Sequence, residues 1–359
     1  MRTLNFSAGP GTLPIQVLEQ AQRDLVDYQG RGLSVMEMSH RSPDYDDIHL
    51  GAIGAMGTLL GVPDTHDVLF LQGGASLQFA MVPMNLMGPD GSADYVVTGT
   101  WAKKAYQEAQ KFGRARLVAS TEEIGHARVP HGSEMDVDPG AAYFHYTSNN
   151  TITGTQFHTM PDVGEVPLVC DMSSDILSRP VNVAAHGLIY AGAQKNMGPA
   201  GTTAVIVQKD LLDRAPDSLP TTLGYKIHSD KESRYNTPPC WAIYIVGLVC
   251  RWVASQGGLT AMARINEEKA AILYERIDRN DFYRGPVEVE SRSRMNVPFR
   301  LPSEDLEARF LVAAGEAQMS NLKGHRSVGG IRASIYNAMP KSGVEALVGF
   351  MDEFERQNG

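Results

Sequence analysis

The sequence predicts an α/β protein whose mostly parallel β-sheet is covered by helices on both faces. Up to residue 207, short runs of consecutive apolar residues recur, and helical patterns separate several of them. Strands without apolar–polar alternation are typical of parallel sheets that are buried on both faces. The chain has 359 residues, of which 43% are hydrophobic and 20% are charged. This composition supports a large buried core, and the length favours two domains.

The expected elements of the first domain alternate between helix and strand. An amphipathic helix is expected over residues 14–29, because apolar residues recur on one face and a proline lies at its start. Ser42-Pro43 begins a second helix, since a serine cap followed by proline suits a helix N-terminus. Two further helices are expected over residues 77–87 and 102–112, and strands over residues 68–71, 95–98, 142–146, 168–170, 188–191 and 203–207.

The chain changes character after Pro216. Residues 217–239 are polar and rich in turn formers, and such a long connection is more often functional than idle. A helix over residues 239–256 then ends at Gly257-Gly258, which is a good C-cap and a candidate hinge. We therefore expect a large domain over residues 1–258, whose first residues could join the small domain, and a smaller α+β domain over residues 259–359. The small domain contains helices from residue 259, over 303–318 and over 343–355, with strands over 295–301 and 330–336.

Composition and missing motifs exclude several classes of function. The net charge of −9 argues against nucleic acid or an anionic membrane as the main partner. The apolar run 242–250 is far shorter than the roughly 20 residues of a membrane helix. The three cysteines form no CxxC pair, and no P-loop or HExxH motif occurs, so we expect a cytoplasmic protein without a metal site. The glycines of residues 51–57 lie in a helical pattern, and we attribute them to close helix packing.

Lys195 is the first candidate for chemistry. It follows the apolar run 188–191 at a turn that contains Gly192 and Gly198, with few charges nearby. The alternative interpretation is an ordinary surface lysine. A desolvated lysine has a lowered pKa, which is what Schiff-base chemistry needs.

Asp171 provides a possible partner for this lysine. It ends the preceding apolar run, and parallel sheets bind ligands at the carboxyl ends of their strands. An aspartate that merely caps a turn is the alternative. Pyridoxal phosphate needs both a lysine for its aldehyde and an anion for its ring nitrogen, so the pair indicates this cofactor.

Anionic and aromatic groups of such a ligand have candidate sites as well. Ala75 and Ser76 follow Gly73-Gly74 between a strand and a helix, where free N–H groups and the helix dipole would hold a phosphate. A plain Gly-Gly turn with Ser76 as the helix N-cap is the alternative. Trp101 follows a strand end, where an indole could stack on a ring, although tryptophans are more often core residues. Two His-Arg pairs suit a substrate with several negative charges. They are His40-Arg41 and His325-Arg326, the second with Arg332 nearby. The alternative is that these residues form surface ion pairs.

Several blocks of sequence together resemble the phosphoserine aminotransferase family. The resemblance extends over essentially the whole chain and is far more specific than the Lys-Asp pair alone. The matching blocks are residues 6–10 (Phe-Ser-Ala-Gly-Pro), 38–41, 73–79, 191–196 (Ala-Gly-Ala-Gln-Lys-Asn), 236–239, 293–299, 324–326 and 332–338.

The resemblance implies a homodimeric fold-type I enzyme that uses pyridoxal 5'-phosphate. It would exchange an amino group between L-glutamate and 3-phosphohydroxypyruvate, giving 2-oxoglutarate and O-phosphoserine for serine biosynthesis. Lys195 would be the Schiff-base lysine and proton carrier, and Asp171 would pair with the ring nitrogen. The other implied cofactor contacts are Trp101 on the ring, Thr151 on the ring hydroxyl, Ala75, Ser76 and Gln194 on the phosphate, and Asn236 and Thr237 from the partner subunit.

The implied substrate contacts are cationic. Arg332 would bind the substrate carboxylate. His325 and Arg326, with His40 and Arg41 of the partner subunit, would bind the substrate phosphate or the glutamate side chain. Some family members have Gly-Arg in place of Ala75-Ser76, and many have Glu in place of Asn150, so substrate preference is the property these departures affect. The sequence does not decide whether phosphohydroxythreonine, an intermediate of pyridoxine biosynthesis, is a second substrate.

Three alternatives remain from the sequence. A serine– or alanine–glyoxylate aminotransferase would have no need for two His-Arg pairs. A cysteine desulfurase would need a reactive cysteine on a mobile loop, whereas Cys170 and Cys250 lie in apolar elements and Cys240 follows two prolines. A non-catalytic protein that binds pyridoxal phosphate or phosphate would keep the anion sites without catalysing amino-group exchange.

Overall fold

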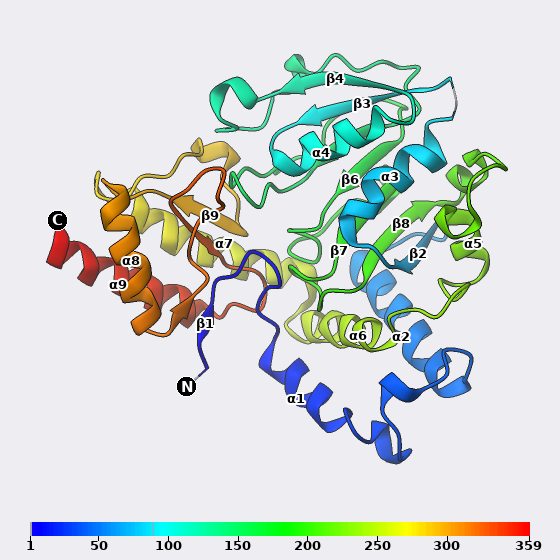
Figure 1. Cartoon of the computed structure of the whole chain (residues 1–359), viewed down its shortest axis with the longest axis horizontal. Coiled ribbons are helices and arrows are strands. Elements are labelled where there is room, and N and C mark those ends of the chain that lie inside the picture. The colour runs from blue at the N-terminus through cyan, green and yellow to red at the C-terminus, as the bar shows by residue number, and fades with distance from the viewer. Residues whose placement is uncertain (1, 89) are drawn as a thin grey trace.

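A seven-stranded sheet forms the centre of the computed structural model, which describes residues 2–88 and 90–359 (Figure 1). β8 is antiparallel to both of its neighbours, and the remaining pairs are parallel. This confirms the predicted α/β class with a mostly parallel sheet. In sheet order the strands are β2 (His66–Leu71), β8 (Thr203–Gln208), β7 (Leu188–Gly192), β6 (Leu168–Asp171), β5 (Phe144–Thr147), β3 (Ser92–Val97) and β4 (Arg114–Ser120).

The edge strand β4 was not predicted from the sequence. Its residues Arg-Ala-Arg-Leu-Val-Ala-Ser do not form a continuous apolar run, and most of them are partly or fully exposed. Arg116 lies 3.2 Å from both Asp94 and Asp138, so this strand is held partly by charge. Edge strands commonly carry charged residues, which discourage pairing with other chains.

Helices cover both faces of the sheet. Successive residues of β2 point to opposite sides: Val68 and Phe70 pack in one core, and Leu69 and Leu71 in the other. The first core includes α2 (Pro43–Leu60) and α6 (Cys240–Ser255), and the second includes α3 (Gly74–Leu86) and α4 (Thr100–Ala109). Ser42 caps α2 as predicted, its side chain accepting from the Tyr45 N–H.

Three expectations from the sequence need correction. The first helix, α1 (Ile15–Arg23), ends six residues early, because the chain turns at Asp24. The polar segment 217–239 contains a short helix, α5 (Tyr225–Asp230). Side chains at Gly51, Gly54 and Gly57 would meet nothing within 4 Å. These glycines therefore do not pack against the described residues, and the close approach of α2 and α6 is at Gly247 and Ala52 instead.

A third core lies in the C-terminal part of the chain, on the left of Figure 1. β1 (Leu4–Asn5) pairs with β10 (Met319–Ser320), and Phe6 is buried in this third core. The N-terminal segment therefore packs with C-terminal residues, although the division at residue 258 stays a prediction. The other elements are α7 (Gly258–Ile277), β9 (Asn296–Phe299), α8 (Glu304–Glu316), β11 (Ile331–Ser334), which is antiparallel to β9, and α9 (Lys341–Asn358).

The junction of α6 and α7 is a sharp bend at two glycines. Gly257 and Gly258 have φ values of 96° and 74°, a left-handed conformation that glycine adopts at little cost. Within the described ranges, no single helix has both the length and the apolar character to cross a membrane. Taken together, α6 and α7 meet that test by length and composition alone, with an angle of 81° between them.

Candidate active site

Lys195 lies in a turn at the carboxyl edge of the central sheet. β7 ends at Gly192, and the neighbouring strand β6 ends at Asp171, which is in register with Tyr190. The N-terminal segment crosses this turn: the Gly11 N–H donates to the Gln194 carbonyl at 2.7 Å. A Cβ on Gly11 would lie 2.4 Å from the Lys195 carbonyl oxygen, so only glycine fits this close approach.

The Lys195 ammonium is partly buried between Thr151 and Trp101. Its Nζ donates to Thr151 Oγ1 at 2.6 Å and lies 5.7 Å from the centre of the Trp101 ring. Burial lowers the pKa of Lys195 to about 8; Asp171 opposes this shift, and Arg332 adds to it. The expected desolvation of this lysine is thus present, and a useful fraction of the amine is neutral near physiological pH.

Asp171 is a buried carboxylate fixed by its own turn. Its Oδ1 accepts from the Ser173 N–H at 2.9 Å, and the Ser173 hydroxyl accepts from the Gly192 N–H at 3.1 Å. Burial raises the pKa of Asp171, and the nearby Lys195 works in the opposite direction. Ser173 therefore links the end of β6 to the end of β7, and the structure places Asp171 and Lys195 at these adjacent strand ends, Lys195 in the turn that follows β7.

A helix N-terminus at the same edge is suited to an anion. α3 follows β2 directly, and β2 and β7 flank β8 with their carboxyl ends on one side. Gly73 and Gly74 adopt φ values of 87° and 65°, which lets the backbone turn into the first turn of α3. Ala75 and Ser76 lie in that first turn, where N–H groups lack helical partners. The Gln194 side chain packs against Gly192, where a Cβ would lie 2.7 Å from its Oε1.

Trp101 is the second residue of α4 and presents its ring toward Lys195. Its buried Nε1 has no hydrogen-bond partner among the described residues. One turn later, Lys104 Nζ lies 4.7 Å from the centre of the same ring. Sequence reasoning missed Lys104; its spacing of three residues from Trp101 on a predicted helix was the available signal.

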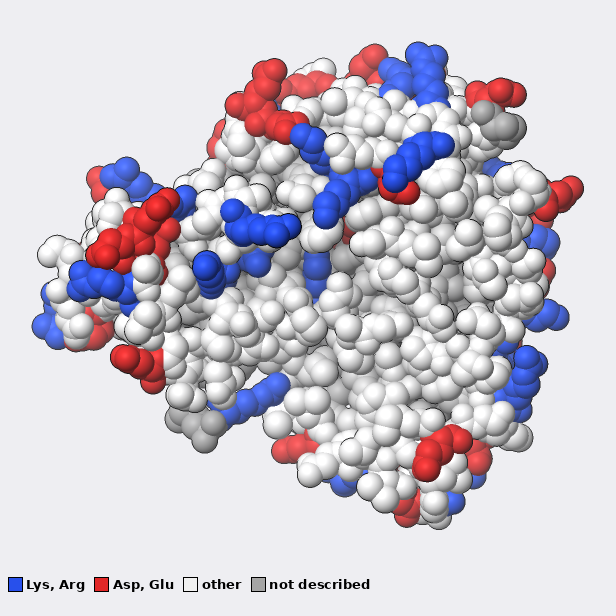
Figure 2. Space-filling view, in the orientation of Figure 1, with Lys and Arg blue, Asp and Glu red and all other residues white. Residues whose placement is uncertain are grey.

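Cationic side chains gather beside this site. Arg332 on β11 donates from Nη1 to the Thr151 carbonyl at 3.1 Å. Burial lowers the pKa of His325, and the charges of Arg332, Arg326 and Lys104 lower it further, so these three cations lie within electrostatic reach of His325. Figure 2 shows Lys and Arg side chains around the hollow between α4 and the C-terminal part of the chain. We call Lys104, His325, Arg326 and Arg332 the cation cluster.

Four predicted residues are not brought to Lys195 by the contacts of this single chain. His40 and Arg41 precede α2, and His40 Nε2 is buried without a partner among the described residues. Asn236 and Thr237 are exposed. The Thr237 carbonyl accepts from Gln72 Nε2 at 2.9 Å, and Asn236 borders a hollow of about 290 Å³. The resemblance assigned all four to a neighbouring subunit, which a single chain cannot test.

Known proteins resemble the whole chain. Residues 3–347 match the family model described as Aminotransferase class-V. The phosphoserine aminotransferase of Laribacter hongkongensis (strain HLHK9) is 57% identical over 360 residues, covering 100% of each chain. A solved phosphoserine aminotransferase from Bacillus circulans subsp. alkalophilus shares 51% identity with a TM-score of 0.98, over 100% of this chain and 99% of that one. The pyridoxal-phosphate-bound enzyme from Trichomonas vaginalis shares 40% identity with a TM-score of 0.94, over 98% and 100%.

Proposed function

Because this chain belongs to the phosphoserine aminotransferases of aminotransferase class V, we propose that it transfers the amino group of L-glutamate to 3-phosphohydroxypyruvate. The products are 2-oxoglutarate and O-phospho-L-serine, a step of serine biosynthesis. The observation that carries the proposal is the Lys195–Asp171 pair at adjacent strand ends, facing the cation cluster. Phosphohydroxythreonine has the same anionic groups and is a second substrate to test.

The proposed cofactor is pyridoxal 5'-phosphate, and the residues at the site fit it. Lys195 supplies the amine, Asp171 the anion for the ring nitrogen, and Thr151 a hydroxyl that accepts from Lys195, while the Thr151 carbonyl accepts from Arg332. The unpartnered Trp101 Nε1 belongs to an indole whose face is presented at the site. The phosphate would be bound by Ala75 and Ser76 at the start of α3 and by Gln194 in the turn after β7. When bound, the cofactor withdraws electrons from the substrate α-carbon, and a protonated ring nitrogen favours this.

The chain's own groups would then bind the substrate and move a proton. Arg332 presents a planar guanidinium that suits the α-carboxylate of every amino donor. His325 and Arg326 suit the distal phosphate or carboxylate. With the substrate in place, Lys195 Nζ removes the α-proton, since its lowered pKa keeps part of the amine neutral.

The same proposal includes a homodimer with shared active sites. His40, Arg41, Asn236 and Thr237 lack contacts to Lys195 within the described chain, although their residue types suit anions. In a dimer, Asn236 and Thr237 would reach the phosphate of the cofactor in the other subunit, and His40 with Arg41 would complete the substrate site. The exposed glycines of α2, which no described residue covers, are compatible with close approach by a second subunit.

The alternative reactions are poorly supported by the same groups. Burial raises the pKa of the Cys250 thiol to about 12 and that of Cys170 well above its usual value, so neither is a ready nucleophile for desulfuration. The pKa of Cys240 is raised as well. Small neutral substrates, such as those of a glyoxylate aminotransferase, would need only Arg332 of the cation cluster and would leave Lys104, His325 and Arg326 without a role. A protein that only binds phosphate would not need a lysine with a lowered pKa, and one that only binds pyridoxal phosphate would not exchange amino groups with its ligands.

The visible spectrum of the purified protein tests the proposal. We expect a yellow protein whose colour bleaches on addition of O-phosphoserine and persists with alanine. Equal bleaching by both would indicate an aminotransferase for small substrates. A protein that stays colourless after incubation with pyridoxal phosphate would overturn the enzyme assignment.

A further inference from the structure

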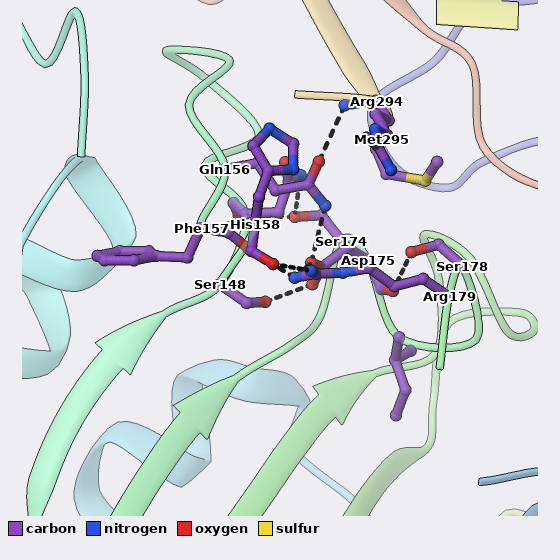
Figure 3. Close-up of polar contacts among 12 residues, drawn as sticks. Ser148, Gln156, Phe157, His158, Ser174, Asp175, Ser178, Arg179, Arg294 and Met295 are labelled. Carbon is purple, nitrogen blue, oxygen red and sulfur yellow. Dashed lines mark hydrogen bonds and ion pairs between the residues drawn. The ribbon is translucent and has the colours of Figure 1, made fainter. Parts of the chain in front are cut away.

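Asp175 is a second buried carboxylate, four residues after Asp171. Its side chain is 2% exposed. It accepts hydrogen bonds from the Ser148 hydroxyl and, at 3.0 Å, from Gln156 Nε2, and Arg179 Nη2 lies 3.5 Å away (Figure 3). These donors hold the buried carboxylate in place, because breaking one contact leaves a buried polar group undersatisfied.

Arg179 extends this contact to a second loop. Its Nη2 donates to the Phe157 carbonyl at 2.7 Å, and its Nη1 donates to the His158 carbonyl at 3.0 Å. The guanidinium therefore joins Asp175, in the segment after β6, to the loop after β5. That second loop also carries Thr151, the acceptor for Lys195.

The Ser148 hydroxyl links the network to Asp171 itself. It lies 3.1 Å from the Asp171 carbonyl and within hydrogen-bond distance of Asp175, and the Ser148 N–H donates to the same carbonyl at 3.0 Å. The backbone of Asp171 is thus held against Ser148, the first residue of the loop that follows β5 and carries Thr151.

Gln156 links the network to the substrate side. Its Oε1 accepts from the Arg294 backbone N–H at 3.0 Å (Figure 3). Its backbone N–H donates to the Ser291 carbonyl at 2.9 Å. Residues 291–294 lead into β9, where Pro298 is in register with Arg332 of β11. The carboxylate of Asp175 is therefore connected through Gln156 to the segment before β9, the strand that pairs with β11 and its Arg332.

We propose that Asp175 is a positioning residue of this aminotransferase: held by Arg179, it fixes the loop that carries Thr151 against the loop that carries Asp171. It thereby sets the relative position of two side chains assigned to the cofactor ring. This inference rests on the proposed function and adds a role to a residue that contacts no assigned ligand. A misplacement of about 1 Å can cost roughly 100-fold in rate.

Asp175 also adds a negative charge behind the site. The charged groups that face Lys195 are Asp171, Arg332 and Asp175, and the last of these raises the Lys195 pKa slightly against the effect of burial. The titratable and charged groups near Asp175 itself are Arg179, His158, Tyr146, Cys170, Tyr336 and Asp171. Removing the Asp175 charge should lower the Lys195 pKa further, an effect that a purely mechanical role would not produce.

The test compares Asp175→Asn with Asp162→Asn. Asp162 is exposed and accepts only from the Gly164 N–H among the described residues, so its variant loses the same charge without disturbing a network. We expect Asp175→Asn to reduce kcat about 10- to 100-fold with KM for O-phosphoserine unchanged, since the cation cluster is intact. It should also weaken binding of pyridoxal phosphate to the apoprotein and move the pH midpoint of the visible absorption downward. Asp162→Asn should match the wild type in kcat, in KM, in cofactor affinity and in the pH midpoint of the visible absorption.

Two further variants keep the proposal falsifiable if Asp175→Asn does not fold. Arg179→Lys keeps the charge but loses the fork that holds two carbonyls, so kcat should fall without a shift in the pH midpoint. Ser148→Ala should give a smaller fall of the same kind. A folded Asp175→Asn, or a folded Arg179→Lys, with wild-type kcat and cofactor affinity would overturn the inference. Failure of the wild type to bind the cofactor or to transaminate would instead reject the proposed function itself.

Discussion

The two sides of the site are built differently. On the cofactor side, Lys195 and Asp171 lie at ends of central strands, and hydrogen bonds fix each of them. On the substrate side, Lys104 and Arg326 are exposed side chains on a helix and a loop. The buried side depends on the identity and position of single groups, whereas the exposed side depends on summed charge and, in the proposed dimer, on residues from a second subunit. Substitutions on the buried side should therefore have larger effects.

The largest effect is expected from Lys195→Ala. This change removes the amine proposed to bind the cofactor and to carry the proton, and turnover should fall by more than about 10⁴-fold. Single-turnover conversion of O-phosphoserine, followed by loss of the visible colour, measures it. Retention of normal turnover would place the reacting amine elsewhere. The exposed Lys341→Ala, which loses only a surface ion pair with Glu268, is the control.

The next largest effect is expected from Asp171→Asn, which should reduce kcat by about 10²- to 10⁴-fold because the ring nitrogen loses its proposed anion.

The thermal stability of the Asp171→Asn apoprotein should change in the opposite sense. Burial raises the Asp171 pKa, so the ionised carboxylate destabilises the fold above that pKa and the penalty vanishes below the ordinary pKa. The apoprotein variant should then melt at a higher temperature at pH 7, with the gain disappearing in acid. A lower melting temperature at pH 7 would contradict this sign.

Arg332→Lys tests the residue that joins the two sides. Arg332 is half-buried against the Thr151 carbonyl and belongs to the cation cluster. A lysine keeps the charge but loses bidentate geometry, so kcat/KM for both glutamate and O-phosphoserine should fall about 100-fold, as truncated buried charge contacts do. An effect confined to O-phosphoserine would mean that Arg332 binds the phosphate rather than the shared carboxylate.

The sequence predicted the buried side better than the exposed side, for physical reasons. Continuous apolar runs identify central strands, and the residues that end them, Asp171 and the turn before Lys195, follow directly. The exposed strand β4 and the short helix α5 carry mixed polar residues, so no periodic signal marked them. The network around Asp175 was equally invisible, because Gln156, Arg179 and Ser148 meet only through loops distant in sequence.

The smallest effect should come from Lys104→Met, and a neighbouring lysine makes it interpretable. Lys104 lies over the Trp101 ring and faces His325, whereas Lys103 pairs with Glu122 at 2.6 Å. If Lys104 adds charge for the substrate phosphate where this chain has Ser76 in place of arginine, Lys104→Met should raise KM for O-phosphoserine about 2- to 5-fold, as exposed charges do. Added salt should reduce the difference.

Lys103→Met removes the same charge from the adjacent position and should leave KM for O-phosphoserine unchanged. Equal effects of the two variants would mean that only the net charge near α4 matters. If neither variant changes KM for O-phosphoserine, phosphate recognition depends on the His-Arg pairs alone. A specific effect of Lys104→Met would instead show that an exposed lysine, held in place by an aromatic ring, contributes to the choice of a phosphorylated substrate.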